Sequence, residues 1–279
     1  MSLPTKLDTY PLARGVIDSV RLNVCHFIWK KYFPWVVHPS VKLDGRPNLR
    51  IADVGCGTGI WLLEAAEEYP NADGLDGLDI ALHQAPPKHL LPRNVQFKHL
   101  DLHQEIPAEF VGQYDLVHAR FLLGLVRNND PVPLLQNLLK LLKPGGYLQW
   151  NEVDWASDLY IGLEENGITQ EESGLHKMRA WGKPFLGEVT WPKKMEEIVK
   201  AQGLEDVQLA RKTKNDLPRQ YSMFWTEALV AAGIDMTGKL PEGPMRDQAA
   251  QLVEEASLDA KKGIAWAGDH MVVVGRKPL

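Results

Sequence analysis

The stretch Ile51-Ala52-Asp53-Val54-Gly55-Cys56-Gly57-Thr58-Gly59 joins an apolar run to an acidic residue and then to three glycines at alternate positions. Residues 60–69 follow with helical spacing and stop at Pro70. The pattern predicts a strand, a tight turn and a helix N-terminus in direct succession. Glycine lets the backbone approach a ligand closely, and free N–H groups at a helix start favour a carboxylate or a phosphate. A tight turn without a ligand is the plainer alternative.

The spacing of the glycines distinguishes two kinds of nucleotide-binding loop. A dinucleotide fingerprint has the form G-x-G-x-x-G, or ends in Ala. Counted from Gly55, the last position of that fingerprint is Ile60, so the sequence does not fit it. A dinucleotide-dependent oxidoreductase is therefore disfavoured, and a measurement of NAD binding would test it.

Composition limits the compartment and the partners that we expect. The 279 residues include 31 Lys and Arg against 36 Asp and Glu, which predicts no broad surface for nucleic acid or anionic membrane. The two cysteines, Cys25 and Cys56, indicate a reducing compartment rather than a disulfide framework. The N-terminus lacks the apolar run of a signal peptide, and no stretch approaches the ~18 apolar residues that cross a bilayer. We expect a cytoplasmic protein whose oligomeric state is open, with a monomer as the starting expectation.

Apolar runs alternate with helical patterns, which is typical of a doubly wound α/β fold with a mostly parallel sheet and helices on both faces. The expected strands are residues 49–54, 74–80, 95–100, 114–119, 147–152, 207–212 and 270–275. The expected helices are residues 14–33, 60–69, a Leu-rich run between Asp130 and Lys143, 170–181, 192–202, 218–233 and 244–263.

The helix expected at residues 14–33 has apolar residues at helical spacing and polar residues on its other faces. An amphipathic surface helix with a solvated polar side is one interpretation. The other is a helix laid over the open end of the sheet, with Tyr10, Arg21 or His26 directed at a ligand.

Polar residues stand at the strand ends, where ligands collect in an open α/β sheet. Asp79 ends the second strand, and its carboxylate can accept two hydrogen bonds from a ribose diol; a helix or turn cap is the alternative. Asp101 follows the third strand and can accept from an adenine amine, although Asp after a strand often only begins a turn. His118 ends the fourth strand. Together with the glycine stretch, these positions predict one ligand site.

The motif D-x-G-x-G-x-G at residues 53–59 resembles the first motif of the class I S-adenosylmethionine-dependent methyltransferases. The resemblance covers most of residues 10–155. Flanking segments are similar to the methyltransferases of fungal secondary-metabolite clusters, a subgroup that includes enzymes that S-methylate reduced epipolythiodioxopiperazines of the gliotoxin type. These segments are residues 21–26, 59–62, 84–87, 126–133 and 145–150.

The resemblance implies a Rossmann-like, seven-stranded fold with S-adenosylmethionine as cofactor and S-adenosylhomocysteine as product. The first motif would hold the methionine part of the cofactor, and His118 would face the reacting centre. The ribose and adenine would meet the residues after the second and third strands. The cofactor-binding residues expected in this way are Tyr10, Arg21, Asp53, Gly55, Cys56, Gly57, Gly59, Asp79, Ile80, Asp101, Leu102 and His118. Cys56 is expected to be a small filler of the loop and not a nucleophile.

The resemblance also implies that residues 1–279 form a single methyltransferase domain. Residues 10–47 would be an N-terminal helical cap and residues 48–155 the cofactor-binding half. Residues 156–279 would be the substrate half, with a helical lid at 218–263. The two helical segments would close over the strand ends.

The acceptor that the resemblance implies is a small fungal metabolite, and we favour a thiol of a reduced gliotoxin-type dithiol, methylated in two turnovers. A thiol with a free pKa near ~8.5 is already partly ionised at neutral pH. The alternatives are O- or N-methylation of another metabolite and a non-catalytic, methyltransferase-like regulator of secondary metabolism. Candidates for assisting deprotonation are His118, His26 and Glu152. For Glu152 and the neighbouring Asp154, a solvated loop acid is the plainer alternative.

We expect no metal ion, and we expect a pocket for an apolar acceptor. His99, Asp101 and His103 alternate and could share one face, but the ligand set is incomplete and Asp101 already has a role. Several aromatic residues could line a pocket for a compact, ring-containing metabolite, although core packing is their alternative. They are Trp155, Trp181, Trp191, Phe224 and Trp225.

Overall fold

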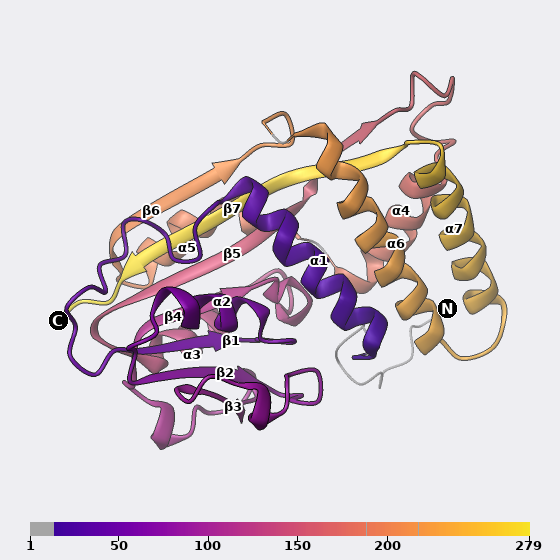
Figure 1. The fold of residues 1–279 in the computed structure, drawn as a ribbon. Coiled ribbons are helices and arrows are strands. Elements are labelled where there is room, and N and C mark those ends of the chain that lie inside the picture. The colour runs from indigo at the N-terminus through magenta and orange to yellow at the C-terminus, as the bar shows by residue number, and fades with distance from the viewer. Residues whose placement is uncertain (1–13, 188, 217) are drawn as a thin grey trace.

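The computed structural model describes residues 14–187, 189–216 and 218–279, apart from the side chains of Phe185 and Leu186. These residues form a seven-stranded sheet in the order β3-β2-β1-β4-β5-β7-β6 (Figure 1). The first five strands in this order, from β3 through β2, β1 and β4 to β5, pair in parallel, whereas β7 runs antiparallel to both of its neighbours. The expected doubly wound, mostly parallel α/β fold is therefore confirmed. The strands are β1 (Arg50–Val54), β2 (Gly74–Asp79), β3 (Val95–His99), β4 (Tyr114–Arg120), β5 (Leu142–Ile161), β6 (Glu205–Lys212) and β7 (Ala265–Arg276).

Helices cover both faces of the sheet because the central strands are apolar on both sides. In β1, Ile51 faces a core shared with α1 and α2, whereas Ala52 and Val54 face a second core shared with α3 and α5. Strands buried on both faces are the rule when crossover helices pack on each side. The helices are α1 (Val16–Tyr32), α2 (Ile60–Glu68), α3 (Val132–Leu141), α4 (Gly174–Leu186), α5 (Met195–Ala201), α6 (Ser222–Lys239) and α7 (Pro244–Lys261).

The longest strand, β5, continues well beyond the predicted end at residue 152. Its ladder with β7 shifts register after Asp154 and resumes through Ile161, which pairs with Ala265. Ser157 and Asp269 hydrogen-bond across this extension at 2.8 Å, so polar side chains are satisfied inside the sheet. Those polar residues broke the apolar pattern, and the sequence prediction therefore ended β5 too early and began β7 (predicted from residue 270) too late.

Helix α6 also differs from its prediction. The pattern indicated an end at Gly233, but the helix continues to Lys239. A Cβ at Gly233 would lie 3.0 Å from the sulfur of Met178 in α4 and 3.1 Å from Val253 in α7. The glycine therefore allows three helices to approach closely and does not end the helix. Helix α4, by contrast, begins later than predicted, because Ser173 accepts a hydrogen bond from the His176 N–H and caps it.

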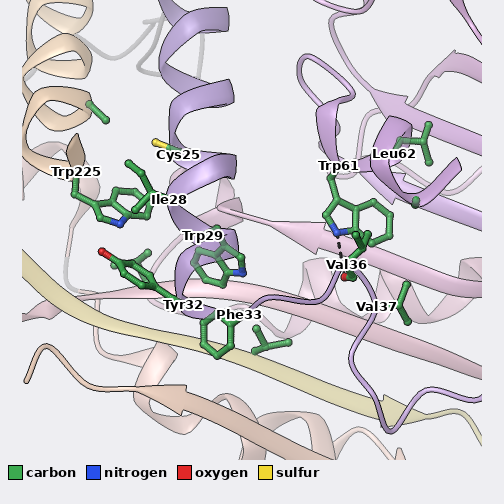
Figure 2. Close-up of a cluster of buried hydrophobic side chains, with 14 of the residues drawn as sticks. Cys25, Ile28, Trp29, Tyr32, Phe33, Val36, Val37, Trp61, Leu62 and Trp225 are labelled. Atoms are coloured by element: carbon green, nitrogen blue, oxygen red, sulfur yellow. Dashed lines mark hydrogen bonds between the residues drawn. The ribbon is translucent and has the colours of Figure 1, made fainter. Parts of the chain in front are cut away.

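Helix α1 lies alongside α6 over one end of the sheet, and α4 and α7 lie on the side of α6 away from α1 (Figure 1). The α1–α6 contact is aromatic: Trp29 and Tyr32 are buried and lie beside Trp225 of α6 (Figure 2). Burying aromatic side chains of this size contributes roughly 1.5–3 kcal/mol each. This packing fixes α1 above the strand ends.

Candidate functional site

The glycine stretch forms a tight turn between β1 and α2. Gly55 donates to the Leu78 carbonyl at 2.8 Å, and Gly59 donates to the Cys56 carbonyl at 2.8 Å. Gly59 has a φ of 73°, and a Cβ there would lie 2.3 Å from the Phe97 ring. Only glycine fits this position without displacing the ring. The turn therefore presents bare backbone to the space beyond β1.

That space is a cavity of about 380 Å³, here named the loop pocket. Its walls combine backbone of the glycine turn with side chains from the ends of four strands. Most of the cofactor residues expected from the sequence line it. They are Asp53, Gly55, Cys56, Gly57, Asp79, Ile80, Asp101, Leu102 and His118.

The remaining expected residues lie elsewhere. Gly59 is the residue before α2 and contacts Phe97. Arg21 forms an ion pair with Asp18 at 2.8 Å and lines a second cavity. His26 is not among the described residues that line either cavity, and Tyr10 lies outside the described residues.

The two aspartates after β2 and β3 also organise the loops around them. Asp79 accepts hydrogen bonds from the N–H groups of Gly57 and Ala81, each at 2.9 Å. Asp101 accepts from the His103 N–H at 2.9 Å. The turn-cap interpretation is therefore correct for both residues. Each carboxylate has further lone pairs, so a cap does not preclude contact with a ligand.

A buried pair, Asp53 and His118, forms the floor of the loop pocket. The Asp53 Oδ1 atom lies 2.7 Å from His118 Nδ1, and Trp61 stacks on the imidazole at 3.7 Å with an interplanar angle of 6°. Burial lowers the pKa of His118, so the ring is neutral and donates its Nδ1 proton to Asp53. The Nε2 atom then has a free lone pair and no partner among the described residues. The sequence had not indicated this pair, because partners on adjacent strands are distant in the chain.

The indole of Trp61 is itself fixed, since its nitrogen donates to the Val36 carbonyl at 3.3 Å (Figure 2). His26 belongs to α1 and is buried. Its Nε2 atom is 2.9 Å from Glu64 Oε2, and its Nδ1 atom is 3.2 Å from the Arg120 guanidinium. Sequence reasoning proposed His26 as a catalytic group and missed Glu64 and Arg120 entirely.

A second cavity of about 450 Å³, here named the apolar cavity, adjoins the loop pocket. Leu22 of α1 and Phe121 after β4 line both cavities. The remaining walls come from the end of β5 and from α4 and α6, and they are mainly apolar. A mostly apolar cavity with a few polar groups is typical of a small-molecule binding site.

Of the five aromatic residues expected around an acceptor, three line the apolar cavity: Trp155, Trp181 and Trp225. The other two expectations were wrong. Trp191 packs in the core, with its ring centre 5.1 Å from that of Trp150. Phe224 lies on the outer side of α6 and is 45% exposed.

Glu152 supplies a carboxyl group to the apolar cavity. Its side chain is fully buried, one oxygen accepts from the Val153 N–H at 3.3 Å, and Oε2 has no partner among the described residues. Burial raises the pKa of Glu152 to about 8. Asp154 is also buried, and burial raises its pKa. The interpretation of these two residues as solvated loop acids is therefore wrong.

In the described part of the chain, no group of three or more His, Cys, Asp or Glu residues could hold a metal ion. None of the described helices has the length and apolarity to cross a bilayer.

Comparison with known proteins now identifies the family. Residues 34–209 match a family model described as a methyltransferase domain. This match covers more than half of the chain. The chain belongs to the methyltransferase-domain family. The dinucleotide-dependent oxidoreductase that the glycine spacing disfavoured is thereby set aside, and the protein is a methyltransferase.

Curated relatives of this methyltransferase come from fungi. Methyltransferase grgD of a Penicillium species is 28% identical over 97% of each chain. N-methyltransferase verN of Clonostachys rogersoniana is 33% identical, but the match covers 50% of this chain and 49% of verN. The secondary metabolism regulator LAE1 of Hypocrea atroviridis is 34% identical over 50% of this chain and 39% of LAE1.

Solved structures support the fold. Phosphoethanolamine N-methyltransferase 2 of Haemonchus contortus, solved with S-adenosylhomocysteine, has a TM-score of 0.52 at 16% identity and covers 92% of this chain and 53% of that protein. The cyclase SpnF has a TM-score of 0.53 at 18% identity and covers 94% and 82%. At this identity the likeness establishes the Rossmann-like methyltransferase fold and says nothing about the substrate.

Proposed function

We propose that this methyltransferase transfers the methyl group of S-adenosylmethionine to a small, largely apolar fungal metabolite bound in the apolar cavity. The observation that carries the proposal is the shared wall between the two cavities, formed by Leu22 and Phe121. Two ligands that meet at such a wall have their reacting atoms side by side. Holding two reactants in line lowers the entropic part of the barrier to a direct displacement.

The residues of the loop pocket fit the cofactor. The bare glycine backbone suits the methionine part, Asp79 can accept from the ribose hydroxyls, and Asp101 can accept from the adenine amine. The unpartnered His118 Nε2 atom is available to accept a hydrogen bond from a polar group. When bound, S-adenosylmethionine supplies a methyl group already activated by its sulfonium. The chain's own residues then align the acceptor, exclude water and take up the acceptor's proton.

The proton acceptor that we assign is Glu152, and its pKa favours a thiol acceptor. A thiol has a free pKa near about 8.5, so moving its proton to a carboxylate with a pKa of about 8 costs under ~1 kcal/mol. A phenol or an ammonium group, with a pKa near about 10, would cost roughly 3 kcal/mol. The reduced dithiol predicted from the sequence therefore matches the buried carboxyl best.

N-methylation is the second candidate, because two of the relatives are named as N-methyltransferases. These are verN and tcpN of Claviceps purpurea, each 33% identical over about half of this chain. LAE1 is named as a regulator instead, and measurable turnover would distinguish this chain from a non-catalytic regulator.

The test is an assay of the purified protein with S-adenosylmethionine and two acceptors of one dioxopiperazine scaffold. The first acceptor carries the reduced dithiol with methylated ring nitrogens, and the second carries free ring N–H groups and no thiol. Mass spectrometry counts the methyl groups that each acceptor gains. We expect mono- and then bis-S-methylation of the first acceptor and no change in the second.

Glu152→Gln supplies the mechanistic arm of this assay, and Glu205→Gln on the exposed edge of β6 is its control. The wild-type rate on the thiol should rise toward pH 8, and Glu152→Gln should lower it at every pH below 8. Methylation of the N–H acceptor alone would refute the thiol proposal and favour the second candidate. An identical pH profile in Glu152→Gln would remove Glu152 from the proton transfer.

A further inference from the structure

Arg120 is a cation in the loop pocket that neither the sequence motif nor the comparisons single out. It ends β4, and its partly buried side chain lines the pocket beside the glycine turn. Among the described residues, its hydrogen-bond partner is the His26 Nδ1 atom at 3.2 Å, and no carboxylate forms an ion pair with it. Burial lowers the pKa of Arg120, and the carboxylate of Asp53 opposes that shift from a distance. The guanidinium has five N–H donors, so most of them remain available to a ligand.

The geometry fixes the state of His26. A guanidinium can only donate, so the Nδ1 atom of His26 must accept, and its proton must lie on Nε2. The Nε2 atom lies 2.9 Å from Glu64 Oε2, a close contact without the geometry of a hydrogen bond, and Lys30 pairs with the other oxygen of Glu64 at 2.8 Å. Burial lowers the pKa of His26 to about 3, which agrees with a neutral ring at physiological pH. Close polar contacts therefore connect Lys30, Glu64, His26 and Arg120 in that order.

The last member of this series, Arg120, forms no ion pair among the described residues, although the carboxylates of Asp53 and Glu64 act on it electrostatically. His26 is neutral and balances no charge, while Glu64 is already paired with Lys30. A partly buried guanidinium in such a position is stabilised by an anion that binds it directly. The methionine carboxylate is the anionic group of S-adenosylmethionine, and the residues of the glycine turn stand directly beside Arg120. In the sheet, Asp53 pairs with His118 and Val54 with Ala119, so Arg120 comes level with Gly55.

We propose that Arg120 binds the methionine carboxylate of the cofactor, and that His26 and Glu64 are positioning residues that orient its guanidinium. The inference rests on S-adenosylmethionine as the cofactor and not on the identity of the acceptor. It replaces a deprotonating role for His26 with an orienting role. It also gives α1 a direct connection to cofactor binding, because His26 belongs to α1 and Glu64 to α2.

The test compares two ligands that differ by the carboxylate alone. S-adenosylhomocysteine carries it, and S-adenosyl-3-thiopropylamine has the same adenosine, thioether and amine without it. Isothermal titration calorimetry on wild type and Arg120→Met gives four dissociation constants. We expect Arg120→Met to weaken S-adenosylhomocysteine about 10- to 100-fold, the range for a lost charged hydrogen bond. Binding of the decarboxylated ligand should stay within about twofold, because it never had that contact.

A loss of similar size for both ligands would overturn the inference, since Arg120 would then only support the fold. Arg127 also lines the loop pocket and is the matched control. A selective loss of S-adenosylhomocysteine in Arg127→Met, with Arg120→Met unaffected, would likewise overturn it. Arg120→Lys keeps the charge and should lose less affinity than Arg120→Met, which serves if the Met variant does not fold. A wild-type protein that binds neither ligand would refute the cofactor itself.

The positioning residues are tested with a conservative pair. His26→Asn keeps an acceptor near the Nδ1 position and should retain most of the affinity, whereas His26→Leu removes the acceptor. We expect His26→Leu and Glu64→Gln to weaken S-adenosylhomocysteine selectively, by less than Arg120→Met does. Equal affinities for S-adenosylhomocysteine in His26→Leu and wild type would overturn the positioning role.

Discussion

The buried carboxyl group of Glu152 makes the stability of this protein depend on pH in an unusual direction. A carboxyl with a pKa of 4.5 when unfolded and about 8 when folded holds its proton in the folded state while the unfolded chain has released it. Between these values the folded state binds more protons, so the free energy of unfolding falls as the pH rises. The stabilising contribution is complete below pH 4.5 and is lost as the pH passes 8.

The size of the effect follows from the shift. Each pKa unit corresponds to about 1.36 kcal/mol, so the interval from pH 6 to pH 9, which spans the folded pKa of about 8, lowers the free energy of unfolding by about 3 kcal/mol. Glu152→Gln has a neutral side chain of the same length and lacks this dependence. Relative to wild type, the variant should therefore gain about 3 kcal/mol between pH 6 and pH 9.

Urea unfolding at the two pH values measures this difference, and subtracting the variant from wild type cancels the other titrating groups. Circular dichroism and tryptophan fluorescence should give coincident transitions, so that a single free energy applies. If the difference between wild type and Glu152→Gln is the same at pH 6 and pH 9, Glu152 ionises normally in the folded protein. Its assignment as the proton acceptor would then lose its physical basis.

Three further predictions concern the loop pocket and its helices. Asp79→Ala should weaken S-adenosylhomocysteine by ~1–3 kcal/mol in calorimetry, because the carboxylate also holds the Gly57 N–H, and Asp79→Asn should lose less. Gly59→Ala should lower the melting temperature and cofactor affinity together, since its Cβ would lie 2.3 Å from Phe97; an unchanged melting curve would contradict this. Hydrogen exchange in α1 and α6 should slow when cofactor and product bind, and a response confined to the sheet would exclude their role as a lid.

The strands and the glycine turn could be predicted from sequence because their signals are local. Ile51, Ala52 and Val54 are apolar and are followed by glycine, so strand, turn and helix follow from a few neighbouring residues. The order of the strands was not predicted, because the pattern shows which segments are strands and not which strands pair. Strand ends were predicted poorly where polar residues such as Ser157 are paired across the ladder with residues far along the chain.

In the candidate site, too, residues with a local sequence signal could be predicted, and residues defined by long-range contacts could not. Asp79 and Asp101 were found because the end of a buried strand is a recognisable position in the sequence. Arg120 and Glu64 were missed because their importance arises from contacts with His26, which is distant in sequence from Arg120. The burial of Glu152 was missed as well, since a carboxylate after a strand gives no local sign of whether a helix covers it.

Phe121 connects the chemistry to the cost of building the site. Its backbone has a φ of 59°, the left-handed conformation that bulky side chains avoid, at a cost of about 1–3 kcal/mol. The packing that holds it there is aromatic: its ring centre lies 5.3 Å from that of Trp29 in α1 and 5.9 Å from that of Trp225 in α6. The same ring lines both cavities. The strained turn thus places Phe121 at the boundary where donor and acceptor would meet, and the contacts that offset its strain come from the helices that cover that boundary.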